Sequence, residues 1–286
     1  MSSNKQFNQD LYKNLISEGI KKVNKMSFGE AETDFLKAIQ LDKKNCLAYI
    51  NLSNIYIIQN NVKHAVQLLM DYILKYSFNE SISNHTAKIL YTYKYGKEML
   101  TLFKATNLNL KNNYRKKNYL YFIQGLYYER EQKYQVAKEA YNRCISCNKY
   151  YFNCYISLLN LYEKTNEFKK YNSLLKKSFK NFNKDDQSKI LLLYKSLILN
   201  REKKFNESQK VITDNNLYIQ LKNENSLLTK LLDIEAKNNE KLKNFSLAFK
   251  KIDERNNIIA GLNENKNFDG KNIYNSIDKY KVFFNK

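Results

Sequence analysis

The clearest pattern in this chain is a set of small and large apolar residues spaced like one face of a helix. Ala31, Phe35 and Ala38 are separated by four and three residues, so they share one face of an α-helix. An apolar stretch around Leu15 and Gly19 precedes them, and a short polar stretch lies between the two. The pattern predicts two consecutive amphipathic helices that form a hairpin.

The same pattern returns along the chain, first from Leu15 to Tyr49, and the unit that contains Leu192 is slightly shifted. Four extra residues interrupt the steps at Asn112–Lys117. In each step, small residues fall where paired helices must approach closely, and large residues fill the space between them. The recurring positions are Tyr49, Leu52, Ser53, Tyr56, Ala65 and Leu69; Ala87, Leu90, Met99 and Phe103; Tyr121, Gly125, Tyr128, Ala137 and Tyr141; Tyr155, Leu158, Leu159, Tyr162, Tyr171 and Leu175; and Leu192, Ser196, Leu199, Ser208 and Ile212.

At Leu15, Gly19, Ala31 and Phe35 the chain resembles the tetratricopeptide repeat, a helix–turn–helix unit of about 34 residues. Glu18 and Lys22 stand where that family has other residues. A single hairpin of this length cannot bury its apolar face alone, so the repeats must stack. The resemblance implies an all-α fold, a right-handed α-solenoid of six or seven tetratricopeptide-like hairpins with a C-terminal capping helix.

The repeat also predicts where the chain divides. We expect a flexible N-terminus over residues 1–11, the repeat array over 12–252, and a linker with the capping helix over 253–286. Leu227–Ile234 and Leu242–Ile252 form a degenerate seventh pair in this interpretation. The predicted capping helix carries Ile273, Ile277, Tyr280 and Phe284 on one face.

Two helix starts have recognisable signals. Ser27 and Glu30 have the S-x-x-E spacing of a capping box. Asn45 is placed to cap a helix that begins at Cys46.

The composition weakens the charge as a clue to function. A formal net charge of +21 is typical of proteins that bind nucleic acid or anionic membranes. The chain is also rich in Lys, Asn, Ile and Tyr, and it lacks Pro and Trp. An AT-rich gene produces this composition, so we interpret the lysines as a solvated helical surface.

The N-terminus lacks the apolar segment of a secretory signal. The most apolar run, residues 190–199, is short and contains Lys195, whereas a membrane-spanning helix needs about 20 apolar residues. The four cysteines do not resemble the disulfide framework of a small secreted domain. These features predict a soluble protein of the reducing cytoplasm.

No set of residues predicts catalysis. Cys144, Cys147 and Cys154 could supply three zinc ligands, but a fourth is missing, because His64 and His85 lie two repeats away. Free cysteine also behaves as a small apolar residue, and we favour packing. Gly96–Lys97 lacks the preceding residues of a phosphate-binding loop. We therefore predict no enzymatic activity for this chain, no metal and no cofactor.

The segment of residues 111–122 interleaves cations with aromatic rings, a combination that can hold single-stranded nucleic acid. Its basic residues fall in a predicted loop between repeats, so we favour a solvated loop over contact with nucleic acid as a partner.

In the tetratricopeptide family the first helix of each pair lines the concave surface, and the resemblance assigns the inward positions here. They form a mixed apolar and amide groove for a protein or peptide ligand. The family's clamp for a terminal carboxylate is not reproduced, since of Ile16, Ile20, Asn51, Ser81 and His85 only Asn51 fits it. The predicted groove residues are Ile16, Ile20, Ile50, Asn54, Tyr119, Phe122, Ile156 and Asn160.

The predicted function is a non-catalytic scaffold that binds proteins or peptides through this face. Two alternatives stay open. Residues 247–280 resemble the junction to the sulfotransferase domain of some bacterial repeat proteins, which implies an accessory region whose catalytic domain would follow Lys286. The other alternative is RNA binding by a basic helical surface.

Overall fold

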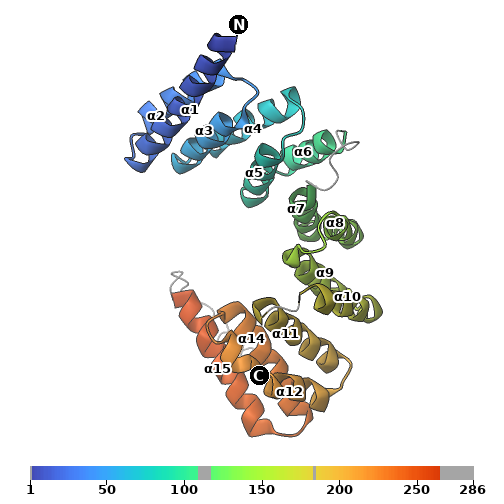
Figure 1. The fold of residues 1–286 in the computed structure, drawn as a ribbon. Coiled ribbons are helices and arrows are strands. Elements are labelled where there is room, and N and C mark those ends of the chain that lie inside the picture. Colours follow the sequence, from blue (N-terminus) through green and yellow to red (C-terminus); the bar gives the residue numbers. More distant parts are fainter. Residues whose placement is uncertain (1, 109–116, 183–184, 265–286) are drawn as a thin grey trace, which may run out of the picture. The chain divides into compact units, whose positions relative to one another are not determined.

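The computed structural model describes residues 2–108, 117–182 and 185–264, which contain fifteen α-helices and no strand (Figure 1). The prediction of an all-α fold is confirmed. The helices are α1 (Ser2–Asn24), α2 (Phe28–Leu41), α3 (Cys46–Ile58), α4 (Val62–Lys75), α5 (Glu80–Thr92), α6 (Gly96–Leu108), α7 (Asn118–Arg130), α8 (Tyr134–Cys147), α9 (Phe152–Lys164), α10 (Phe168–Asn181), α11 (Asp185–Arg201), α12 (Phe205–Asp214), α13 (Leu217–Leu221), α14 (Asn225–Lys241) and α15 (Phe245–Glu264).

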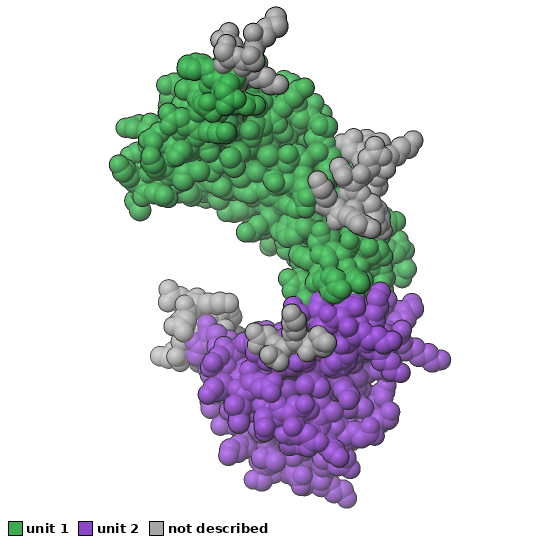
Figure 2. All heavy atoms as spheres, in the orientation of Figure 1, with its two compact units in different colours: residues 1–161 green, residues 162–286 purple. Residues whose placement is uncertain are grey.

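The chain forms two compact units, Met1–Leu161 and Tyr162–Lys286 (Figure 2). In unit 1, α1 packs on α2, α3 on α4, and α7 on α8. The first helices of successive pairs also touch, because α1 contacts α3, α3 contacts α5, and α5 contacts α7. In unit 2, α11 packs on α12 and α14 on α15. Each unit is therefore a stack of helical hairpins, as the repeat predicts.

The predicted alternation of small and large residues is what lets paired helices approach. A Cβ atom added to Gly19 would lie 2.6 Å from the ring of Phe35. At Gly125 the same atom would lie 2.3 Å from the ring of Tyr141. Both rings are completely buried, so glycine is the residue that the hairpin contact requires at each of these two positions.

A second repeated feature is the turn between the two helices of a hairpin. Met26, Asn60 and Lys94 all have a φ angle near +60°, and each stands one repeat length after the one before it. After each one, the next backbone N–H donates to the carbonyl five residues earlier, as in Ser27 to Lys22 at 2.9 Å. This is the Schellman ending of a helix, in which glycine is the usual left-handed residue. The same backbone occurs at Gln132, Asn166, Lys203 and Lys243.

These turns carry a backbone cost that glycine would remove. Replacing Met26 or Lys94 by glycine is expected to raise the free energy of unfolding of unit 1 by about 0.5–1 kcal/mol, because a side chain disfavours the left-handed region. Urea denaturation measures the change. The control is Lys104→Gly at an exposed position inside α6, which should lower the same free energy by about 1 kcal/mol. A loss of unfolding free energy in the Met26 or Lys94 variant equal to that of the control variant would contradict a backbone cost at these turns.

The two predicted helix caps have different outcomes. Asn45 caps α3, since its side chain accepts from the backbone N–H of Leu47 at 3.2 Å. The capping box at Ser27 is wrong, because the Ser27 side chain makes no capping hydrogen bond. The Schellman turn uses the Ser27 backbone N–H, which donates to Lys22. Glu30 consequently has no backbone group to accept from and lies 3.8 Å from the Lys22 ammonium.

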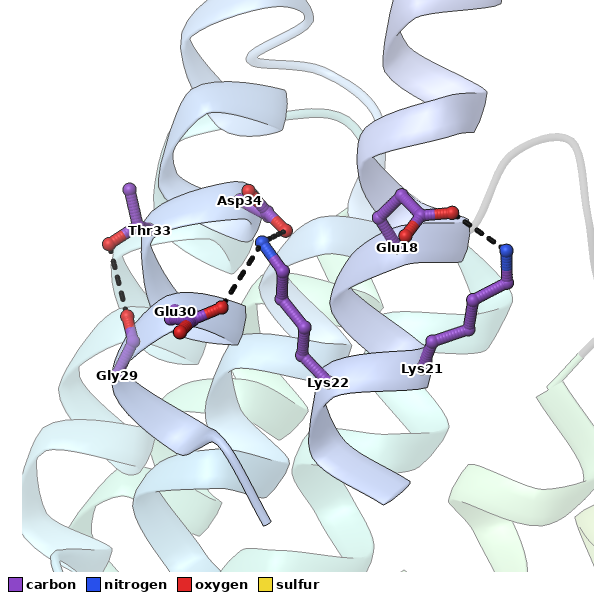
Figure 3. Close-up of polar contacts among 7 residues, drawn as sticks. All are labelled: Glu18, Lys21, Lys22, Gly29, Glu30, Thr33 and Asp34. Carbon is purple, nitrogen blue, oxygen red and sulfur yellow. Dashed lines mark hydrogen bonds and ion pairs between the residues drawn. The ribbon is translucent and has the colours of Figure 1, made fainter. Parts of the chain in front are cut away.

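Lys22 departs from the family pattern, and the structure shows what it does instead. Its Nζ lies 2.7 Å from Oδ2 of Asp34, which is buried on the next helix (Figure 3). Glu18, the other departure, pairs with Lys21 on its own helix at 2.7 Å. The α1–α2 hairpin therefore contains a partly buried ion pair in addition to its apolar contact.

The ends of the predicted array differ from the observed helices. α1 begins at Ser2, within the segment predicted to be flexible, and α15 continues to Glu264, past the predicted array boundary at residue 252. The predicted seventh pair corresponds to α14 and α15, and α13 is an additional short helix that the pattern did not predict. The predicted capping helix with Ile273, Ile277, Tyr280 and Phe284 lies outside the described residues, so it stays a prediction.

The interpretation of Cys144 as a packed thiol is wrong in one respect. Cys144 is completely buried, as expected, but it forms a disulfide bond with Cys154. The turn between α8 and α9 brings their Cα atoms to 6.6 Å, a distance that periodicity along one helix cannot predict. Since stable disulfides are rare in a reducing cytosol, the cytoplasmic location stays a prediction.

Among the described residues, none of the helices is long and apolar enough to cross a membrane. Within the same part of the chain, no three His, Cys, Asp or Glu side chains are grouped so that they could hold a metal ion.

Candidate functional site

The predicted groove residues all belong to unit 1, on α1, α3, α7 and α9. Ile16 is only 5% exposed and belongs to the core with Tyr12 and Phe35, so it offers little surface to a ligand. Ile20 and Asn54 are exposed. The remaining members are half-buried: Ile50, Tyr119, Phe122, Ile156 and Asn160.

A pocket of about 420 Å³ lies between the neighbouring first helices α5 and α7. α5 also contacts α3, the helix that carries Ile50 and Asn54. Of the predicted groove residues, only Tyr119 belongs to the pocket lining. The lining residues are Glu80, Asn84, His85, Lys88, Asn118 and Tyr119.

The repeat contained a signal for this pocket that the sequence prediction did not use. A step of one repeat from Ile50 and Asn54 leads to Asn84 and Lys88. These two residues hold the same inward positions on α5 as the predicted pair holds on α3. The third repeat matches the pattern weakly, and the predicted groove residues include none of its positions.

His85 joins α5 to α3 through one hydrogen bond. Its Nε2 lies 2.9 Å from Oγ of Ser53, and the Ser53 hydroxyl donates to the carbonyl of Ile50 at 2.7 Å. Since that hydroxyl proton is used, Ser53 can only accept, and His85 must carry its proton on Nε2. Nδ1 is then the nitrogen that can take up a second proton.

Burial lowers the pKa of His85 from its ordinary value, and the charge of Lys88 lowers it further. The imidazole is therefore neutral at pH 7. An anion near Lys88 would reverse the second of these effects.

This shift has a consequence for stability. The pKa of His85 is lower in the folded chain than in the unfolded chain, so the unfolded chain binds more protons as the pH falls below about 6.5. The free energy of unfolding is expected to decrease from pH 7.5 to pH 5.5. Urea denaturation of the wild type and of His85→Gln at both pH values measures it. An equal decrease in the two proteins would contradict the assignment.

The other polar groups of the pocket lack partners within the described part of the chain. Asn84 Oδ1 is buried without a hydrogen bond, although burying an unpaired amide oxygen is costly. The side chains of Glu80, Lys88 and Asn118 make no hydrogen bond or ion pair to any described residue, and neither does the hydroxyl of Tyr119. The side chains of Glu80, Lys88, Asn118 and Tyr119 thus offer the pocket polar groups that a bound molecule could satisfy.

An aromatic cluster supports one side of this pocket. The ring of Phe122 lies 5.4 Å from that of Tyr151 and 6.3 Å from that of Tyr141. The Tyr119 ring lies 6.5 Å from Phe122, and burial raises the pKa of the Tyr119 phenol. These contacts hold the Tyr119 ring in the pocket lining and the Phe122 ring about one helical turn further along α7, and binding anchors need such fixed rings.

Unit 2 has a smaller hollow of about 260 Å³, lined by Glu163, Arg201, Lys230 and Asp233 among others. Its two carboxylates are already paired, since Glu163 pairs with Arg201 and Asp233 pairs with Arg255. It is a weaker candidate for that reason.

The basic segment 111–122 does not form the solvated loop that the sequence predicts at its described end. Lys117 is 2% exposed, and its Nζ donates to the carbonyl of Thr106 at 2.7 Å. The same ammonium lies 4.7 Å from the centre of the Phe78 ring. Lys117 is therefore used inside unit 1, and residues 111–116 lie outside the described part of the chain.

No model of a protein family matches this sequence, and no curated protein matches it. Solved structures do match. The chain is similar to pilF of Pseudomonas aeruginosa, with 17% identity and a TM-score of 0.55 over 76% of this chain and 92% of that one. It is similar to a tetratricopeptide repeat protein of Parabacteroides merdae, with 17% identity and a TM-score of 0.52 over 87% and 93%. It is also similar to RapI in its apo form, with 13% identity and a TM-score of 0.57 over 87% and 76%.

The class of protein follows from these likenesses and from the stacked hairpins. At such identities the matches concern the fold, and the fold is the tetratricopeptide-type helical repeat that the sequence predicts. The resemblance of residues 247–280 to a sulfotransferase junction is not tested by them and stays a prediction.

Proposed function

We propose that this chain is a non-catalytic scaffold that binds a protein segment along the first-helix face of unit 1. The single observation that carries the proposal is the pocket between α5 and α7 with its unpartnered polar lining. A segment of protein supplies both the donors and the acceptors that this lining lacks.

The half-buried apolar residues on the first helices α3, α7 and α9 are the proposed anchors. Ile50 on α3 and Ile156 on α9 offer aliphatic surface, while Tyr119 and Phe122 offer aromatic surface on α7. Asn54 and Asn160 add amide groups from the same positions of their repeats. A row of such side chains suits an extended or helical peptide better than a small molecule, since it continues over several helices.

The test removes the two aromatic anchors together. Tyr119→Ala with Phe122→Ala is expected to weaken capture of a partner at least tenfold, because buried aromatic residues dominate such interfaces. Affinity capture followed by mass spectrometry identifies the partner, and titration with the purified partner measures the loss.

Two controls separate binding from folding. Phe122 contacts the buried Tyr141 and the half-buried Tyr151, so thermal melting of the double variant must show a folded protein. Val136→Ala shortens an exposed apolar residue of α8, the second helix of that hairpin, and should leave capture unchanged. Unchanged capture by the folded double variant would refute this binding face.

A further inference from the structure

The pocket between α5 and α7 has two ends that differ in charge. Glu80, Asn84 and Lys88 follow one another at four-residue steps along α5, so they share one stripe of the helix. The separation of Glu80 and Lys88 along the sequence corresponds to about 12 Å along the helix axis. The carboxylate therefore stands at one end of the pocket and the ammonium at the other.

The groups at the Lys88 end can surround a negative charge. Lys88 has no acidic partner among the described residues. His85, three residues earlier, can take up a proton on Nδ1 because Nε2–H is held by Ser53. Across the pocket, the amide of Asn118 and the hydroxyl of Tyr119 are further donors without a partner in the described part of the chain. α3, which packs against α5, bears no charged residue.

From this arrangement we infer that the Lys88 end of the pocket binds an acidic side chain of the protein ligand, and that His85 takes up a proton when it does. The inference rests on the proposed function and adds a chemical class of ligand to it. The net charge of +21 agrees with this class, since it attracts acidic segments and repels basic ones.

The proton uptake follows from the electrostatics of the empty pocket. Without a ligand, burial and Lys88 both favour the neutral imidazole. A carboxylate placed between Lys88 and His85 offsets the positive charge of the Lys88 ammonium. It also accepts a hydrogen bond from His85 Nδ1 once that nitrogen is protonated. Binding should therefore become tighter as the pH falls toward 5.5, while the ligand's carboxylate remains ionised.

The experiment probes the full chain with an array of immobilised short peptides in matched pairs. The members of a pair are identical except that Asp and Glu in one are Asn and Gln in the other. We expect the acidic members to bind more strongly. The ratio of binding between the acidic and the neutral member of a pair should be at least about threefold larger at pH 5.5 than at pH 7.5. His85→Gln should abolish the pH-dependent part of the preference, whereas Lys88→Gln should weaken the preference at both pH values.

Lys63→Gln is the matched control, because it removes the same charge from an exposed position on α4, outside the first-helix face. It should keep the full preference. An equal loss in Lys63→Gln and Lys88→Gln would show that bulk charge is responsible and would overturn the inference.

A second measurement observes the proton directly. The chain has two histidines, so nitrogen NMR of the imidazoles separates His85 from the exposed His64. Addition of an acidic peptide selected on the array should raise the pKa of His85, and the resonances of His64 serve as the internal reference. A bound acidic peptide that leaves His85 unchanged would overturn the inference.

The outcomes also separate this inference from the proposed function. If peptides bind, require Tyr119 and Phe122, and show no preference for acidic members, the groove stands and the acidic subsite is refuted. If the wild type binds no peptide on the array, peptide binding by this face is refuted, and the acidic subsite with it.

Discussion

Gly125→Ala is expected to lower the free energy of unfolding of unit 1 by about 3 kcal/mol, since overpacking a tight core contact costs this much. The new methyl group would lie 2.3 Å from the Tyr141 ring, far inside van der Waals contact. That ring is completely buried and its hydroxyl donates to Glu129 at 2.8 Å. Neither the ring nor the paired helices α7 and α8 can move without losing other contacts. Urea denaturation measures the change.

Gly29 provides a control with the opposite sign. It lies in α2, where an added methyl group meets nothing within 4 Å, so Gly29→Ala should raise the free energy of unfolding by up to about 1 kcal/mol. Tyr141→Leu combined with Gly125→Ala should cost less than the two changes separately, because leucine leaves room for the methyl group. Additive losses would contradict the proposed clash.

Reduction of the Cys144–Cys154 disulfide is expected to lower the free energy of unfolding of unit 1 by about 3 kcal/mol. The bond closes a loop with a sequence separation of 10 residues, and a cross-link of that length removes this much chain entropy from the unfolded state. Urea denaturation with and without dithiothreitol measures it.

The variant with Cys144→Ala and Cys154→Ala is the control and should show no dependence on the reductant. Thiol titration of the denatured, unreduced chain gives a separate readout, because one disulfide leaves two of the four cysteines titratable. Four titratable thiols would show that the bond is absent in solution, and the interpretation of both residues as packed thiols would then return.

The hairpins could be predicted because side-chain size recurs with the period of one repeat. Gly19 with Phe35 and Gly125 with Tyr141 are pairs within one hairpin, so a fixed distance along the sequence places them in contact. Asn45 was predictable as a cap for a similar reason, since its partner Leu47 is two residues away. Ser27 was not, because the preceding helix uses the same backbone N–H.

The candidate site was predictable only in part. Stepping through the repeat predicts the first-helix face, and of the residues predicted there only Tyr119 on α7 belongs to the pocket lining. It could not show that Ile16 is buried in the core, since burial depends on how far α1 is covered by α2 and α3. The third repeat, which holds Asn84, His85 and Lys88, matches the pattern too weakly to be assigned without the structure.

The sequence by itself determined the helical class, the repeat length and the faces that pack together, because these depend on side-chain size and spacing over one or two helices. Only the tertiary structure decided which groups meet across repeats. His85 meets Ser53, Lys117 reaches Thr106, and Cys144 meets Cys154. Those contacts depend on the angle and distance at which one hairpin stacks on the next. Small residues at the contacts permit such stacking, but the packing of the whole unit sets its geometry.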